Sequence, residues 1–283
     1  MSSRIPNVLS IAGVDPSGGA GVFADLKAFA ALGAYGCGVV TALTAQNTQA
    51  VTGISPVGAD FIRLQIDTLF ADLRIDAIKI GMLGTAPIIR AVAEGLARPL
   101  SVGQPAHRVH RVLDPVMVAK SGDALLEPQA VSMLIDAVLP LATVLTPNLP
   151  EAGVLLRSRE PETPGEMRRA AERLRRLMND DGQRWVLLKG GHLQGDAIDL
   201  LHDGDVMIEL TAPRIETRNT HGTGCSLSAA IAARAPQTQD LPEAVREAKR
   251  WLTEAIRHSG ELTVGQGHGP VHALHNLWGR ADR

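Results

Sequence analysis

The sequence predicts an α/β protein in which helices cover both faces of a central, mostly parallel β-sheet. Short apolar runs rich in β-branched residues alternate with longer segments of helical periodicity, as repeated strand–helix units require. Glycine-rich or polar segments follow several of the predicted strands, where the chain turns toward the next helix. The 283 residues contain no internal repeat and no long linker, so we expect a single domain over residues 1–283.

The predicted elements alternate along the whole chain. The helix at 164–179 has the clearest amphipathic pattern, because its apolar residues recur at helical spacing. The segments at 99–107 and 117–123 are expected to be irregular. In chain order we expect a strand at 8–12, a helix at 21–32, a strand at 37–43, a hairpin-like segment at 51–57, a helix through 61–69, a strand at 77–80, a helix at 86–97, a strand at 111–113, continued alternation through 131–139, 144–145 and 151–156, the helix at 164–179, a strand at 185–188, an antiparallel pair at 198–201 and 206–210, and helices at 225–234 and 242–258.

Charge and composition exclude several classes of protein. There are 28 basic and 30 acidic residues, which leaves no basic footprint for nucleic acid. No apolar run approaches the ~20 residues that a membrane helix needs, and the amino-terminal segment lacks the pattern of a signal peptide. Only two cysteines are present, so there is no disulfide framework. We therefore expect a cytoplasmic protein without nucleic-acid or membrane partners.

The most informative segment is the glycine-rich turn at 219–225, which is followed by a run of good helix formers. Free amide N–H groups at the start of such a helix form an anion site, and phosphate is the anion most often bound there. Gly222, Thr223 and Gly224 are the predicted donors. Cys225 lies in the first helical turn, where the field of the helix is expected to lower the pKa of its thiol. This combination indicates phosphoryl transfer.

Polar side chains follow the predicted strands at the edge where α/β sheets bind ligands. Asp114 and Glu151 are candidate ligands for Mg²⁺, which proteins hold through few carboxylates, water and substrate phosphates. Lys189 could neutralise a phosphate, although a lysine at a strand end can also simply be solvated. Asn148 is a candidate for the nucleotide site, and the alternative for Asn148 and Glu151 together is a helix-capping pair.

Two further segments are candidates for the second substrate. The loop 15–21 contains glycines that let the backbone approach a ligand closely, although a tight strand-to-helix turn explains it equally well. Gln46 ends the second predicted strand, and its amide offers both a donor and an acceptor to a heteroaromatic edge. The alternative is an ordinary polar loop residue.

Four motifs occur together in the order of a known family: residues 12–21, 146–152, 189–192 and 219–225, which read AGVDPSGGAG, TPNLPEA, KGGH and NTHGTGC. They resemble the ribokinase-like superfamily, and more closely the hydroxymethylpyrimidine/phosphomethylpyrimidine kinases of thiamine biosynthesis. The resemblance implies a ribokinase-like sheet and a homodimer. It also implies a pyrimidine site formed by Gln46, Asp15, Ala20, Met82 and Val116, and a site for ATP phosphates and Mg²⁺ formed by Asp114, Asn148, Glu151, Lys189 and the turn at 222–225.

The resemblance implies two successive phosphorylations. A pyrimidine hydroxymethyl group first attacks the γ-phosphate of ATP, and the Cys225 thiolate is the expected acceptor of its proton. The resulting monophosphate is then phosphorylated again. That nucleophile is already anionic at neutral pH, so it needs no base, and Lys120 is the expected counter-charge.

Three alternative functions remain open at this stage. A vitamin B6 kinase acts on a related ring bearing a hydroxymethyl group. A non-catalytic pyrimidine sensor would bind without turnover. An acyltransferase would use Cys225 as a covalent nucleophile, although no His–carboxylate relay is evident in the sequence.

Overall fold

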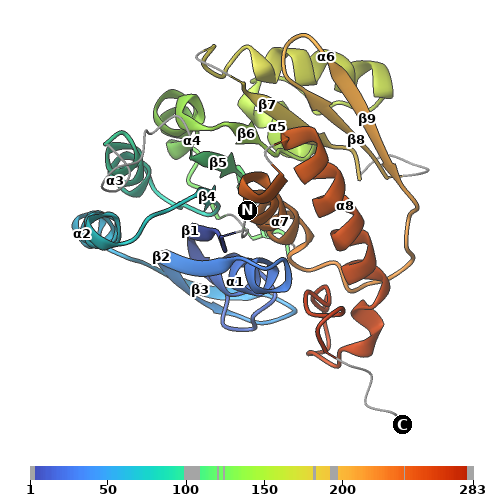
Figure 1. Cartoon of the computed structure of the whole chain (residues 1–283), viewed down its shortest axis with the longest axis horizontal. Helices are drawn as coiled ribbons and strands as arrows, with labels where there is room; N and C mark the ends of the chain where they lie inside the picture. The colour runs from blue at the N-terminus through green and yellow to red at the C-terminus, as the bar shows by residue number, and fades with distance from the viewer. Residues whose placement is uncertain are drawn as a thin grey trace.

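The computed structural model describes residues 4–98, 109–119, 121–123, 125–180, 183–191, 197–238 and 240–278. Its centre is a nine-stranded sheet with the order β3-β2-β1-β4-β5-β6-β7-β8-β9 (Figure 1). The strands are β1 (Asn7–Val14), β2 (Tyr35–Gln46), β3 (Val51–Pro56), β4 (Ala77–Ile80), β5 (His110–Leu113), β6 (Val144–Leu145), β7 (Trp185–Lys189), β8 (Ala197–His202) and β9 (Met207–Ala212).

Parallel pairing joins the six central strands, from β2 through β1, β4, β5 and β6 to β7. Antiparallel strands extend the sheet at both ends, with β3 beside β2 and with β8 and β9 beyond β7. The predicted mostly parallel sheet, the hairpin-like segment and the antiparallel pair are therefore confirmed. Because the central strands run in the same direction, the residues that end them share one edge of the sheet.

Helices cover both faces, as predicted (Figure 1). The larger helices of one layer are α2 (Ala59–Asp72), α3 (Ala86–Leu96), α5 (Leu149–Leu155) and α6 (Pro164–Arg175), and the other layer contains α1 (Gly21–Ala31), α7 (Thr223–Thr238) and α8 (Leu241–Arg257). The alternation of side chains along the strands separates the two cores. Leu9 and Ile11 of β1 lie in the first core, whereas Val8 lies in the second.

Several element boundaries differ from the sequence prediction. Strand β2 begins before the predicted residue 37 and continues to Gln46, since its carboxyl half pairs with β3. The segment predicted to continue the alternation at 131–139 consists of a short α-helix, a π-helical turn and the start of a 3₁₀ turn. The expected irregular segment 99–107 lies outside the described residues. Across the described ranges, no helix combines the length and the apolar character needed to cross a membrane.

Candidate functional site

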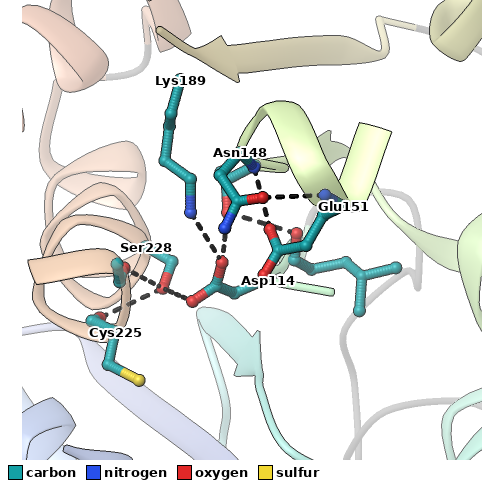
Figure 2. A network of polar contacts seen from close by, with 9 residues as sticks. Asp114, Asn148, Glu151, Lys189, Cys225 and Ser228 are labelled. Carbon is teal, nitrogen blue, oxygen red and sulfur yellow. Dashed lines mark hydrogen bonds and ion pairs between the residues drawn. The ribbon is translucent and has the colours of Figure 1, made fainter. Parts of the chain in front are cut away.

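Two of the predicted residues, Asp114 and Lys189, meet at the carboxyl edge of the sheet. Asp114 directly follows β5 and is 2% exposed, so its carboxylate needs partners within the protein. The Lys189 ammonium, at the end of β7, lies 3.1 Å from Oδ1 of Asp114, and the Ser228 hydroxyl of α7 donates to Oδ2 at 3.2 Å (Figure 2). The Asp114–Lys189 ion pair thus joins the ends of β5 and β7, and the contact with Ser228 connects both to α7.

Asn148 and Glu151 form the capping pair that the sequence offered as an alternative. The Asn148 side chain accepts the Glu151 N–H, and Oε2 of Glu151 accepts the Asn148 N–H, both at 2.8 Å (Figure 2). The capping interaction uses only one carboxylate oxygen. Among the described residues, Oε1 of Glu151 accepts no hydrogen bond, so a capping role and a ligand role are compatible.

Burial raises the pKa of Glu151 to about 7, and Asp114 adds to this effect while the Lys189 charge opposes it. A carboxylate whose negative charge is incompletely compensated is a suitable ligand for a cation. Two carboxylates and one lysine therefore form a group at the edge of the sheet that becomes net negative as the pH rises through about 7.

The turn before α7 has a conformation that requires glycine. Gly222 has φ of 75°, and a Cβ at this position would lie 1.7 Å from the carbonyl oxygen of Gly19. A Cβ on Gly224 would lie 3.4 Å from the Lys189 ammonium, so the start of α7 faces that cation. Within the described part of the chain, the N–H groups of Gly224 and Cys225 donate to no protein acceptor. Of the predicted donors, Thr223 instead donates its N–H to the Thr220 carbonyl at 3.4 Å. The free amides beside Lys189 are therefore those of Gly224 and Cys225.

The expected low pKa of the Cys225 thiol is not found. Burial raises the pKa of Cys225, because the thiolate would lose its hydration, while the charge of Lys79 and an N–H from Gly21 oppose the effect. The prediction considered the field of the helix and missed the loss of hydration, which outweighs the favourable contacts with Lys79 of β4 and Gly21 of α1.

Lys79 belongs to a buried ion pair that the sequence reasoning missed. Its ammonium lies 2.9 Å from Asp25, both side chains are fully buried, and Ser10 donates to the same carboxylate oxygen at 2.6 Å. Asp25 holds the pKa of Lys79 above its usual value, although burial alone would lower it. A lysine between Ile78 and Ile80 in an apolar strand was the available signal.

Asp15 and His221 join the loop after β1 to the turn before α7. The His221 ring lies 2.7 Å from Oδ2 of Asp15, which also accepts the Ala20 N–H, while Oδ1 accepts the Ser17 N–H. Burial would raise the pKa of Asp15, but the bonds from His221 and Ser17 outweigh it and lower the pKa. These contacts are internal to the two loops, and a role of Asp15 toward substrate stays a prediction.

The remaining predicted substrate residues lie at neighbouring strand ends. Gln46 is half-buried at the end of β2, and Met82 is buried after β4, where Thr41 donates to its carbonyl at 2.7 Å. Ala20 is the residue before α1, and Val116 is half-buried two residues after Asp114. Their contacts with substrate stay predictions. Lys120 lies outside the described residues.

Known proteins are similar to this chain over nearly its whole length. A family model described as phosphomethylpyrimidine kinase matches residues 15–272. The chain is 51% identical over 271 residues to the hydroxymethylpyrimidine/phosphomethylpyrimidine kinase of Rhizobium meliloti, covering 95% of this chain and 97% of that protein. It is 48% identical over 274 residues to the protein of the same name from Escherichia coli, covering 96% and 98%.

Solved structures give a similar picture. An ADP complex of Bacillus subtilis pyridoxal kinase has a TM-score of 0.84 and 35% identity, and the match covers 97% of this chain and all of that one. The phosphomethylpyrimidine kinase of Clostridium difficile has a TM-score of 0.75 and 38% identity, covering 89% of this chain and all of that one. The similarities thus extend over nearly the whole chain.

Proposed function

Because the chain belongs to the phosphomethylpyrimidine kinase family, we propose that it phosphorylates 4-amino-5-hydroxymethyl-2-methylpyrimidine to the monophosphate and then to the diphosphate, with ATP as donor. It is a small-molecule kinase of thiamine biosynthesis. The observation that carries the assignment of the transfer site is the position of the free Gly224 and Cys225 amides beside the Lys189–Asp114 pair.

Phosphoryl transfer requires mainly positioning and charge stabilisation from the protein. The free amides at the start of α7 are oriented donors for the oxygens of the migrating group, and they need no reorganisation during the reaction. Lys189 supplies a fixed positive charge 3.1 Å from Asp114 and next to Gly224. We assign the ATP phosphates to the space bounded by these groups, with Asn148 at its α5 side.

The residues present fit a magnesium ion. Among the described residues, no cluster of three His, Cys, Asp or Glu side chains is placed to hold a metal. Mg²⁺ commonly uses only one or two carboxylates and completes its shell with water and substrate phosphates. Oε1 of Glu151 is free of protein donors in the described part, and burial raises the pKa of this group to about 7. Glu151 and Asp114 would hold Mg²⁺, which would neutralise charge on the ATP phosphates.

We assign the acceptor side of the site to the space between the loop 15–21 and Cys225. The thiol lies in the first turn of α7 and receives an N–H from Gly21 at the start of α1. As a thiolate, Cys225 would take the proton of the hydroxymethyl group in the first step and become the neutral thiol. Burial raises the pKa of this thiol, and the neighbouring Lys79 charge would favour the thiolate that must be present before the transfer. In the second step the acceptor is already anionic, and Lys120 would compensate its charge.

A product assay tests the proposal directly. Purified protein is incubated with hydroxymethylpyrimidine, ATP and Mg²⁺, and the mono- and diphosphates are separated by chromatography. Sequential appearance of both products is the expected result. Absence of any pyrimidine phosphate at saturating ATP would refute the function.

A second activity on vitamin B6 compounds is a further candidate. The observation in its favour is the TM-score of 0.84 to a pyridoxal kinase that is 35% identical. Measured side by side, kcat/KM for hydroxymethylpyrimidine is expected to exceed that for pyridoxal.

The homodimer and the cytoplasmic location implied by the resemblance stay proposals. Light scattering in solution would test the homodimer.

A further inference from the structure

The hydroxyl of Thr44 lies between two oxygen atoms that both require a hydrogen. Its Oγ1 is 2.9 Å from the carbonyl oxygen of Val14 and 3.1 Å from the side-chain Oε1 of Gln46. Thr44 and Gln46 are two residues apart on β2, and both are half-buried. A hydroxyl carries one hydrogen and can therefore donate to only one of these acceptors.

The balance of donors and acceptors selects one arrangement. A backbone carbonyl has no hydrogen, so the 2.9 Å contact with Val14 requires Thr44 to donate there. The atom of Gln46 at Thr44 must then be a donor. The two ends of a glutamine amide have the same shape and are assigned from their hydrogen bonds. Exchanging them places Nε2 at Thr44 and satisfies all three groups.

This arrangement determines what Gln46 offers to the rest of the site. With Nε2 bound to Thr44, the carbonyl oxygen Oε1 is turned away from Thr44, and the amide presents an acceptor. Gln46 ends β2 beside β1, and the loop that follows β1 contacts the turn before α7 through Asp15 and His221 at 2.7 Å. The amide is thus connected through Thr44, Val14 and this loop to the predicted site of phosphoryl transfer.

We propose that Thr44 holds the Gln46 amide with its carbonyl oxygen toward the substrate ring and thereby selects a ring that carries a hydrogen-bond donor, such as an exocyclic amino group. Thr44 is in this sense a positioning residue for specificity. The inference rests on the proposed function, because it concerns the ring of the same substrate. A ring with an oxo group at that position would place two acceptors against each other and leave both unpaired.

The test compares the aminopyrimidine substrate with its analogue in which the exocyclic amino group is replaced by an oxo group. Thr44→Val keeps the shape of the side chain and the preference for a strand but removes the hydroxyl. The amide can then rotate and accept either ring. We expect the ratio of kcat/KM for the amino compound to that for the oxo compound to fall about tenfold, the effect of one hydrogen bond. Calorimetric binding of both rings without ATP is expected to show the same change.

Two further variants complete the experiment. Thr44→Ser retains the hydroxyl and is expected to keep the wild-type ratio. Thr52→Val removes another β-sheet threonine hydroxyl, which donates to the Ala45 carbonyl at 3.0 Å, and should also keep it. A folded Thr44→Val protein with the wild-type ratio would overturn the inference and leave the proposed function intact. A wild-type protein that does not phosphorylate the aminopyrimidine would refute the proposed function, and the inference with it.

Discussion

Replacing Glu151 with glutamine separates the two roles that the structure assigns to this side chain. Glutamine also serves at this position of a capping box, so the hydrogen bond to the Asn148 N–H is retained and α5 keeps its start. The substitution removes only the ionisable group. If the stability of wild type depends on pH and that of Glu151→Gln does not, the difference can therefore be attributed to the carboxyl group of Glu151.

The magnitude follows from the pKa. A rise from the ordinary 4.5 to about 7 corresponds to on the order of 3 kcal/mol, since one pKa unit is worth about 1.4 kcal/mol. The folded state holds the proton more tightly than the unfolded chain does. Stability from this group is therefore complete below about pH 4.5 and is lost as the pH rises through about 7. Between pH 5 and 8, wild type should lose about 2 kcal/mol relative to Glu151→Gln.

Urea denaturation of the metal-free proteins at pH 5, 6.5 and 8 measures this difference. Glu166→Gln is the matched control, because Glu166 is the third residue of α6 and its N–H is accepted by the Thr163 cap at 3.2 Å. A backbone hydrogen bond from Glu162 lowers the pKa of Glu166, so its titration lies below this pH range. Equal pH dependence of wild type and Glu151→Gln would refute the reasoning about burial.

The metal role is tested on the same proteins. At pH 8, Mg²⁺ with a non-hydrolysable ATP analogue is expected to stabilise wild type through mass action and to stabilise Glu151→Gln much less. An affinity for the metal–nucleotide that falls by less than about twofold would contradict the assignment of Glu151 as a ligand.

Three further predictions concern the remaining groups of the site. Gly222→Ala should lower kcat by about 100-fold or more with folding retained, because the added Cβ would lie 1.7 Å from the Gly19 carbonyl oxygen and displace the free amides. Circular dichroism checks the folding and kinetics the turnover, and near-normal turnover would contradict the prediction. Lys79→Met should lower the free energy of unfolding by about 3 to 5 kcal/mol, since it leaves Asp25 buried without its counter-charge; a loss below about 1 kcal/mol in urea denaturation would count against the buried ion pair. Cys225→Ala should damage the first phosphorylation much more than the second, and Lys120→Ala the reverse, as separate assays of the two steps would show; equal losses in both steps for either variant would contradict this division.

The order of the elements and the location of the site at the carboxyl edge were predictable from local patterns. Periodicity along the chain identified the strands and helices, and the direction of parallel strands places Asp114, Gln46 and Lys189 at one edge. The glycine-rich turn and the capping pair of Asn148 and Glu151 were also predictable, because their hydrogen bonds involve residues only a few positions apart.

The protonation states and the long-range pairs of the site depended on the tertiary structure. Asp15 and His221 are 206 residues apart, and Lys79 is 54 residues from Asp25, so no local pattern could join them. The pKa of Cys225 is raised because segments distant in sequence enclose the thiol, and this enclosure outweighs the field of the helix that the sequence reveals. Local sequence determines backbone conformation, because that depends on neighbouring residues. Burial and charge pairing are sums over groups that only the folded chain brings together.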